Sequence, residues 1–304
     1  MAAEPAELTR PVPPPRHEVR PAERGRRGAR GLCRAAGWAG SVLAIAAGIV
    51  LGAGSVRAAP LNRSLDTVSP GAEAMWPEAA SRPAAHAQAM SFGGTPAVGA
   101  LFTVVGGRLQ GHFCSASVVD SPGRDLLVTA AHCVSEAGGA ALVFVPGYDG
   151  GRMPYGAWRV SRVFLDRSWL SSFDPDDDVA FLVVAGHGKT KIQNVTGGED
   201  LGLGRSAGQM VSVIGYPQTA NVPILCDNRA REFSPTQLEF DCGGYTDGTS
   251  GAPLLEDVSP LTGLGTVIGV IGGYEQGGDT PSVSYAAQFG PVVAGLYKAA
   301  SRRR

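Results

Sequence analysis

Short apolar runs, rich in valine, recur from about Phe92 onward and are separated by glycine, proline and aspartate. Their length, their aromatic residues and the glycines that bound them are typical of β-strands. Several runs alternate apolar and polar residues, which predicts one face in a core and the other in water. The predicted strands are 97–105, 113–119, 125–130, 141–146, 158–165, 179–184, 210–216, 237–242 and 267–274. So many strands with few helical stretches predict closed or sandwiched antiparallel sheets.

One helix is expected, at the C-terminal end. Residues 289–300 have an apolar spacing that fits a helix, with Val292, Leu296 and Tyr297 along one side. The composition agrees with a well-packed, turn-rich β fold, because 44% of the 304 residues are apolar, 17% are charged and 43 are glycine. The net charge is −1 and the excess of arginine lies in the first 34 residues. The remainder is therefore acidic, and we expect no nucleic-acid partner.

The N-terminal region has the build of an export signal. Residues 1–34 contain eight arginines and four glutamates, and residues 35–55 form a stretch of 21 without charge. This order predicts a secretory signal cleaved near Ala58 or Ala59, although 21 uncharged residues also suffice for a membrane anchor. In both cases everything after Arg57 leaves the cytoplasm. We therefore predict a signal peptide or anchor over 1–58, an Ala/Pro-rich linker or pro-segment over 59–90, and a folded domain over 91–304.

Four cysteines lie in the exported part: Cys114, Cys133, Cys226 and Cys242. An even number in an oxidising compartment predicts two disulfides, for which three pairings exist. No spacing of cysteine and histidine suits zinc, so no metal is expected. The acidic residues Asp174, Asp176 and Asp177 lack the glycine and distal glutamate of an EF-hand loop, and we interpret them as a solvated turn.

The motif T-A-A-H-C, at 129–133, directly follows a predicted strand. His132 is therefore anchored on one side by the sheet, and Cys114, 19 residues before Cys133, can anchor it on the other side by a disulfide. Further along stand D-D-D-V-A-F-L-V-V, which contains Asp178, and G-T-S-G-A-P, which contains Ser250. A histidine, an aspartate and a serine are the residue types of an activated hydroxyl nucleophile.

These three motifs, in this order, resemble those of the chymotrypsin-like (trypsin-fold) serine proteases, with some likeness to bacterial glutamyl endopeptidases. The resemblance extends over about residues 90–300. It implies an all-β fold of two six-stranded antiparallel β-barrels with a C-terminal helix. It also implies His132, Asp178 and Ser250 as catalytic triad, and the N–H groups of Gly248 and Ser250 as oxyanion hole.

The resemblance leaves the substrate pocket less defined. It implies walls that include Gly244, Tyr245, Ile271, Gly272 and Gly273. Gly244 stands where trypsin-like members have an acid, and Ile271 where glutamyl endopeptidases have a histidine. We therefore expect an apolar or small pocket. The resemblance also implies a second disulfide between Cys226 and Cys242. Thr249 replaces the aspartate that in many members binds a newly freed N-terminal amine, so activation by that route is not expected.

The sequence thus predicts an exported, monomeric serine endopeptidase that acts on proteins or peptides without a cofactor. It would be secreted, or would be membrane-anchored if the N-terminal apolar segment is retained. The alternative is a secreted, non-catalytic binding module that has kept the protease fold.

Overall fold

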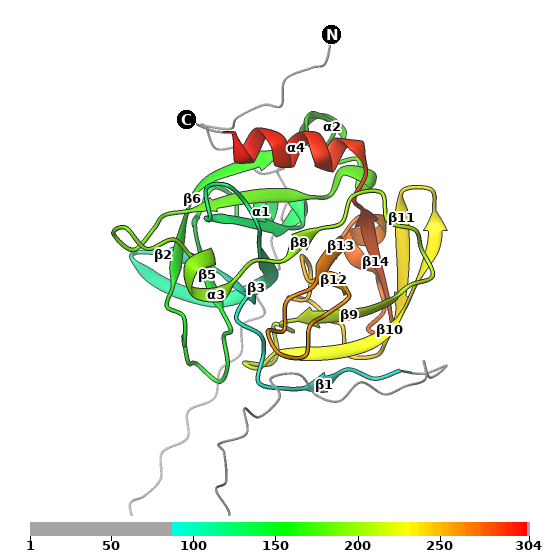
Figure 1. Cartoon of the computed structure of the whole chain (residues 1–304), viewed down its shortest axis with the longest axis horizontal. Helices are drawn as coiled ribbons and strands as arrows, with labels where there is room; N and C mark the ends of the chain where they lie inside the picture. The colour runs from blue at the N-terminus through cyan, green and yellow to red at the C-terminus, as the bar shows by residue number, and fades with distance from the viewer. Residues whose placement is uncertain (1–86, 303–304) are drawn as a thin grey trace, which may run out of the picture. The chain divides into compact units, whose positions relative to one another are not determined.

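A computed structural model of the chain describes residues 87–302. The predicted signal or anchor, and most of the predicted linker, lie outside these residues. The described chain is built mainly of strands, which form two barrels that follow one another in sequence (Figure 1).

The first barrel closes in the order β2-β3-β4-β7-β6-β5, with β5 pairing back onto β2. All of its pairs are antiparallel. Each strand contains or overlaps one of the predicted apolar runs. The strands are β2 (Val98–Val105), β3 (Arg108–Val119), β4 (Leu126–Thr129), β5 (Ala141–Pro146), β6 (Trp158–Leu165) and β7 (Ala180–Val184).

The second barrel also closes through six antiparallel strands, in the order β9-β10-β11-β14-β13-β12, with β9 paired to both β10 and β12. Two short strands extend it: β1 (Met90–Ser91) pairs with β10, and β8 (Asp200–Leu201) pairs in parallel with β13. The barrel strands are β9 (Met210–Gly215), β10 (Ile224–Ser234), β11 (Gln237–Asp241), β12 (Pro253–Glu256), β13 (Thr266–Ile271) and β14 (Val283–Gln288). The predicted pair of six-stranded barrels is confirmed.

Each barrel has its own core, and a third core joins them. Leu127 and Leu182 point into the first barrel, whereas their neighbours Val128 and Phe181 belong to a cluster that also contains Ile214 of the second barrel. Both faces of β7 are therefore buried, which explains why its sequence is continuously apolar instead of alternating. The two barrels are thus held together by apolar packing in which β7 takes part.

The helices are short except for the last. They are α1 (Ala131–Glu136), α2 (Arg167–Ser172), η1 (Pro175–Asp177), α3 (Gln193–Thr196), η2 (Tyr274–Gly277) and α4 (Pro291–Ser301). None of the helices between residues 87 and 302 has the length and apolar character needed to cross a membrane.

The C-terminal helix α4 is confirmed, and it lies across β6 and β7 (Figure 1). Its buried face differs from the predicted one: Val293, Leu296 and Ala300 are buried, whereas Val292 is 43% exposed. The prediction was right for Leu296 and wrong for Val292, because the buried positions follow the spacing 293, 296 and 300 of one helix face. Tyr297 lies at the edge of this face, where its hydroxyl donates to the carbonyl of Asp120 at 2.9 Å.

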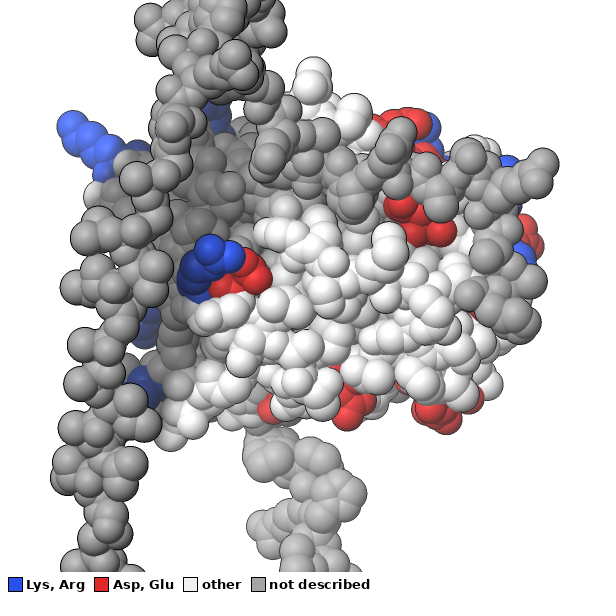
Figure 2. Space-filling model, turned by 90° about the horizontal axis from the view of Figure 1, so that it is seen from below, with Lys and Arg blue, Asp and Glu red and all other residues white. Residues whose placement is uncertain are grey.

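The packed part of the chain begins before the predicted boundary at residue 91. Ala89 donates its N–H to the carbonyl of Gly243 at 2.8 Å, and Gly243 donates to Ala87 at 2.8 Å. The last residues of the predicted linker therefore pair with the second barrel. On the face seen from below, most of the surface that is described is uncharged, and the charged side chains stand singly or in small groups (Figure 2).

Candidate active site

His132 lies on α1, immediately after strand β4 has ended at Thr129. The ring is buried, with 4% of the residue exposed. The next residue, Cys133, forms a disulfide with Cys114 of β3, as predicted. In the chain-entropy account a loop of this size contributes about 3 kcal/mol to stability. The histidine is therefore fixed by the end of one strand and by a covalent link to another.

Asp178 is fully buried between η1 and β7, and its carboxylate faces His132. Oδ1 accepts the backbone N–H of His132 at 2.8 Å, and Oδ2 lies 2.7 Å from His132 Nδ1. Oδ2 also accepts the N–H of Gly273 at 2.8 Å, which comes from the second barrel. A carboxylate that receives these bonds fixes the proton of a neutral imidazole on Nδ1 and leaves Nε2 as an acceptor.

The environment of His132 moves its pKa upward. Burial alone lowers the pKa of the imidazole, but the hydrogen bond and charge of Asp178, together with the charge of Glu136, outweigh burial and raise the pKa above its ordinary value. The imidazole is thus a stronger base than a free histidine. This is the property that a general base needs.

Ser250 lies on a tight loop between β11 and β12 and is half-buried. The loop is anchored to the first barrel through Ser115, whose N–H donates to the Ser250 carbonyl at 2.7 Å and whose hydroxyl donates to the Gly248 carbonyl at 3.0 Å. Gly251 has a φ of +81°, and a Cβ there would lie 2.2 Å from the Ser115 carbonyl oxygen and 2.2 Å from Thr129 Oγ1. Only glycine permits this close approach.

The N–H groups of Gly248 and Ser250 donate to no acceptor among the described residues. Gly248 has a φ of +94°, and a Cβ there would lie 2.5 Å from the backbone nitrogen of Gln218. The glycine therefore permits both the backbone conformation and the contact with the neighbouring loop. Two backbone donors beside a hydroxyl can bind a negatively charged oxygen.

His132 and Ser250 line the same cavity of about 680 Å³. Among the hydrogen bonds of residues 87–302, none joins the Ser250 hydroxyl to the imidazole. Such bonds are often long without substrate. The structure thus brings together all three predicted residues, His132 and Asp178 in direct contact and Ser250 on the shared cavity.

The predicted pocket residues fall into two groups. Tyr245 and Ile271 line the cavity, whereas Gly244, Gly272 and Gly273 do not. Gly272 instead packs against Asp178, since a Cβ there would lie 2.8 Å from Oδ2.

The lining also differs from the apolar or small pocket expected from the sequence. It includes four carboxylates and no lysine or arginine: Glu136, Asp247, Glu275 and Asp279. These acids come from loops and helix ends that are far apart in the sequence. No local pattern predicts that such segments meet at the cavity.

The second predicted disulfide, between Cys226 of β10 and Cys242, is also present. It ties the strand pair behind the Ser250 loop. Cys114, Cys133 and His132 have ligand-type atoms within 4.8 Å of one another. Both sulfurs belong to the first disulfide, so neither cysteine offers a thiolate. This trio therefore cannot act as a metal site of thiolates.

The acidic turn before Asp178 has structural bonds. Asp174 accepts the N–H of Asp176 at 3.1 Å and so caps η1, and Asp177 accepts the hydroxyl of Ser168. Asp176 accepts the side chain of Gln237 at 3.0 Å. The turn is thus more than a solvated loop, because it contacts the second barrel.

Sequence reasoning missed Ser115 and Gln237, which position the loops of the site. Neither belongs to a motif, and no local signal could have found them, because their partners are remote in sequence.

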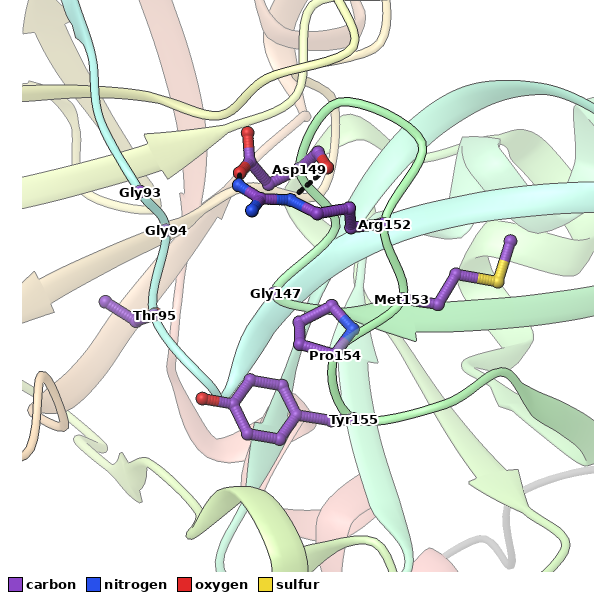
Figure 3. A pocket seen from close by; sticks show the side chains of 9 residues that line it. All are labelled: Gly93, Gly94, Thr95, Gly147, Asp149, Arg152, Met153, Pro154 and Tyr155. Atoms are coloured by element: carbon purple, nitrogen blue, oxygen red, sulfur yellow. Dashed lines mark hydrogen bonds and ion pairs between the residues drawn. The ribbon is translucent and has the colours of Figure 1, made fainter.

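A second cavity of about 540 Å³ lies between residues 93–95 and the loop that follows β5 (Figure 3). Glycines, Thr95 and Tyr155 line it, and its one cation, Arg152, is paired with Asp149. It contains none of the predicted site residues.

Comparison with known proteins agrees with this geometry. Residues 114–270, just over half of the chain, match the family described as trypsin-like peptidase domain. No curated protein matches the chain in sequence.

Three solved structures are similar to the chain. A protease named Anisep from Arthrobacter nicotinovorans is 25% identical, with 70% of this chain and 99% of that chain covered and a TM-score of 0.60. The thermostable serine protease AL20 from an extremophilic microorganism is 26% identical over 69% of this chain and 99% of that chain, with a TM-score of 0.59. A Glu endopeptidase in complex with MPD is 14% identical and shares the fold, with a TM-score of 0.56 over 72% of this chain and 99% of that chain.

Proposed function

The chain belongs to the trypsin-like peptidase family, and from this premise we propose that it is a serine endopeptidase whose triad is His132, Asp178 and Ser250. The observation that carries the proposal is one cavity with two facing features. On one side lies an imidazole held by a buried carboxylate, and on the other a serine hydroxyl beside two unengaged N–H groups. This arrangement is the one that nucleophilic acyl transfer requires.

In the proposed reaction Ser250 Oγ attacks the peptide carbonyl carbon while its proton passes to His132 Nε2. The C–N bond then breaks, the imidazolium returns that proton to the leaving amine, and an ester to Ser250 remains. Water, deprotonated by the same nitrogen, attacks the ester carbonyl carbon. The bond from that carbon to Ser250 Oγ then breaks, the imidazolium returns the proton to Oγ, and the acid is released with the serine restored. Asp178 keeps the imidazole in its orientation and stabilises its charged form without taking the proton.

The oxyanion formed in both steps would accept hydrogen bonds from the N–H groups of Gly248 and Ser250. Loss of one such donor typically raises the barrier by about 2.7–4 kcal/mol. Substrates are proteins or peptides, and the protein acts without a cofactor.

We further propose that the enzyme works outside the cytoplasm. The two disulfides support this location, because such bonds persist in oxidising compartments. The proposed organisation keeps residues 1–58 as signal or anchor, 59–90 as linker or pro-segment and 91–304 as a monomeric catalytic domain, with the last linker residues, from Ala87 on, paired to the second barrel. The rival function is a secreted binding module with an inactive site.

The decisive test uses a fluorophosphonate, which reacts only with an activated serine. The full chain, and the chain trimmed before residue 87 by limited proteolysis, are treated with the reagent and mapped by mass spectrometry. We expect an adduct on Ser250 and its loss in His132→Ala. Peptide hydrolysis should fall about a million-fold in Ser250→Ala.

Ser171→Ala is the matched control, because Ser171 is exposed on α2 and does not line the cavity. It should react and hydrolyse as the wild type does. Full activity in Ser250→Ala would refute the assignment, and absence of an adduct in both forms of the folded protein would favour the binding module.

A further inference from the structure

Gln237, the first residue of β11, is a buried amide that contacts both barrels. Its Nε2 donates to the carbonyl of Pro175 at 2.9 Å and to Asp176 Oδ1 at 3.0 Å. Its Oε1 accepts the N–H of Tyr274 at 3.3 Å. Two acceptors on one side and a donor on the other fix the orientation of the amide, so that all three bonds hold together.

These partners flank one hydrogen bond of the candidate site. Pro175 and Asp176 stand three and two residues before Asp178, and Tyr274 directly follows Gly273. The bond between them runs from the Gly273 N–H to Asp178 Oδ2 at 2.8 Å. Gln237 therefore joins the segment that carries the acceptor to the segment that carries the donor.

The packing around the amide leaves it little freedom. A Cβ on Gly273 would lie 2.2 Å from Gln237 Oε1, so the amide rests directly against the glycine backbone. The Pro175 carbonyl that receives Gln237 also accepts the N–H of Asp178 at 3.4 Å. A shift of the amide would therefore be transmitted to the backbone on both sides of the Asp178 carboxylate.

We propose that Gln237 is a positioning residue of the proposed peptidase, which holds the Asp178 loop and the Gly273 segment before η2 in fixed positions so that the carboxylate orients His132. The inference rests on the proposed function. It adds a residue of the second barrel that acts on the imidazole through Asp178 without contacting the reacting atoms.

The test replaces Gln237 by Met, which has a similar length and volume and no hydrogen-bonding amide. Gln193→Met is the matched control. Gln193 of α3 also makes side-chain bonds to a remote segment, at Ser121 and Asp120, but none of its partners flanks Asp178 or Gly273. Gln237→Glu distinguishes the bonds that the amide donates from the bond that it accepts. It keeps an acceptor for the Tyr274 N–H but places a second acceptor against Pro175 and Asp176 in place of the donor.

Two readouts are measured on the full chain below its melting temperature: steady-state kinetics with a peptide substrate, and NMR titration of the His132 imidazole. We expect Gln237→Met and Gln237→Glu to lower kcat about 10- to 100-fold, with a smaller change in KM. The pKa of His132 should fall in Gln237→Met, because Asp178 is less well held. The titration is read only in this neutral variant, since the added carboxylate of Gln237→Glu would itself raise the pKa of the imidazole. Glu136, the other charge that raises this pKa, is unchanged. Gln193→Met should leave both readouts as in the wild type.

A purely structural role would lower the melting temperature without moving the imidazole titration. Wild-type kcat and an unchanged His132 pKa in a folded Gln237→Met protein would overturn the proposal. The titration needs no turnover. If the wild type fails to hydrolyse peptides, the proposed function fails, and the NMR result still decides the role of Gln237.

Discussion

Thr249, the residue before Ser250, stabilises the loop that carries Gly248 and Ser250 through hydrogen bonds within that loop. Its N–H and its hydroxyl both donate to the carbonyl of Thr246, at 3.1 and 2.7 Å, and the residue is 3% exposed. Gly215 leaves room for it, since a Cβ there would lie 3.1 Å from Thr249 Cβ. An aspartate at this position needs an amine partner, whereas a threonine hydroxyl is satisfied by its own loop.

We predict that Thr249→Val, which removes only the hydroxyl bond, destabilises the protein by about 1 kcal/mol. Because the same turn orients the N–H groups of Gly248 and Ser250, kcat should fall by up to about tenfold. Urea unfolding and steady-state kinetics provide the measurements. Thr249→Ser keeps the hydroxyl and should retain most of kcat. Equal loss in both variants would show that packing, and not the bond, matters.

At the residue scale the sequence predicted the chemistry but not its supports. His132, Asp178 and Ser250 stand in local motifs, which become recognisable through their shared order along the chain. Ser115 contacts Gly248 across 133 positions of sequence, and Gln237 contacts Pro175 across 62. Such partners depend on how the barrels meet, which no local pattern encodes.

Local sequence patterns also predicted only some of the strands. The continuous apolar runs of β2 and β7 were predictable, because their strands are buried on both sides. β10 was missed, since its sequence D-N-R-A-R-E is polar, and β12 was missed because its short run begins with Pro253 and ends with Glu256, residue types that are depleted in strands. Both form because the neighbouring strands present unpaired backbone groups that closure of the barrel satisfies.

Glu199, which lies just before β8, is a buried carboxyl that should make the stability of the fold depend on pH. Burial, with the charge of Asp200, raises the pKa of its carboxyl to about 8, against a lowering by the Gly265 N–H that it accepts. Its other oxygen has no partner within residues 87–302. The folded state therefore favours the protonated acid, so stability is lost as pH rises from the ordinary value of 4.5 through about 8.

Glu199→Gln mimics the protonated acid and cannot ionise. We expect it to match the wild type near pH 5 and to exceed its free energy of unfolding at pH 9. Urea denaturation at both pH values measures the difference. The exposed Glu232, changed to Gln, should show no such dependence. If Glu199→Gln differed from the wild type equally at pH 5 and pH 9, the carboxyl would not titrate as argued.

At the scale of the whole molecule, the candidate site is a product of both barrels. The first supplies His132 and Asp178, and the second supplies Ser250 and the Gly273 N–H. The strand runs predicted closed or sandwiched antiparallel sheets, and the two barrels were implied by the motifs that resemble a known family. The charge of the cavity was not, because its acids come from segments that meet only after both barrels have folded.

That charge leads to a prediction about substrates. Glu136, Asp247, Glu275 and Asp279 line the cavity, and no lysine or arginine lines it with them. Exposed ion pairs contribute about 0.2–1 kcal/mol each. Two or three such contacts should therefore favour a peptide with Lys or Arg near the cleaved bond over its Glu counterpart by roughly tenfold or more in kcat/KM. The preference should shrink at 1 M salt, where the Debye length is only about 3 Å. A peptide library at low and high salt measures this preference.

The double variant Glu275→Gln with Asp279→Asn should lose much of the preference, whereas Asp257→Asn, which changes an exposed acid outside the cavity, should keep it. Equal cleavage of cationic and anionic peptides at low salt would mean that these carboxylates do not contact the bound chain, and that selection depends on the shape of the walls formed by Tyr245 and Ile271.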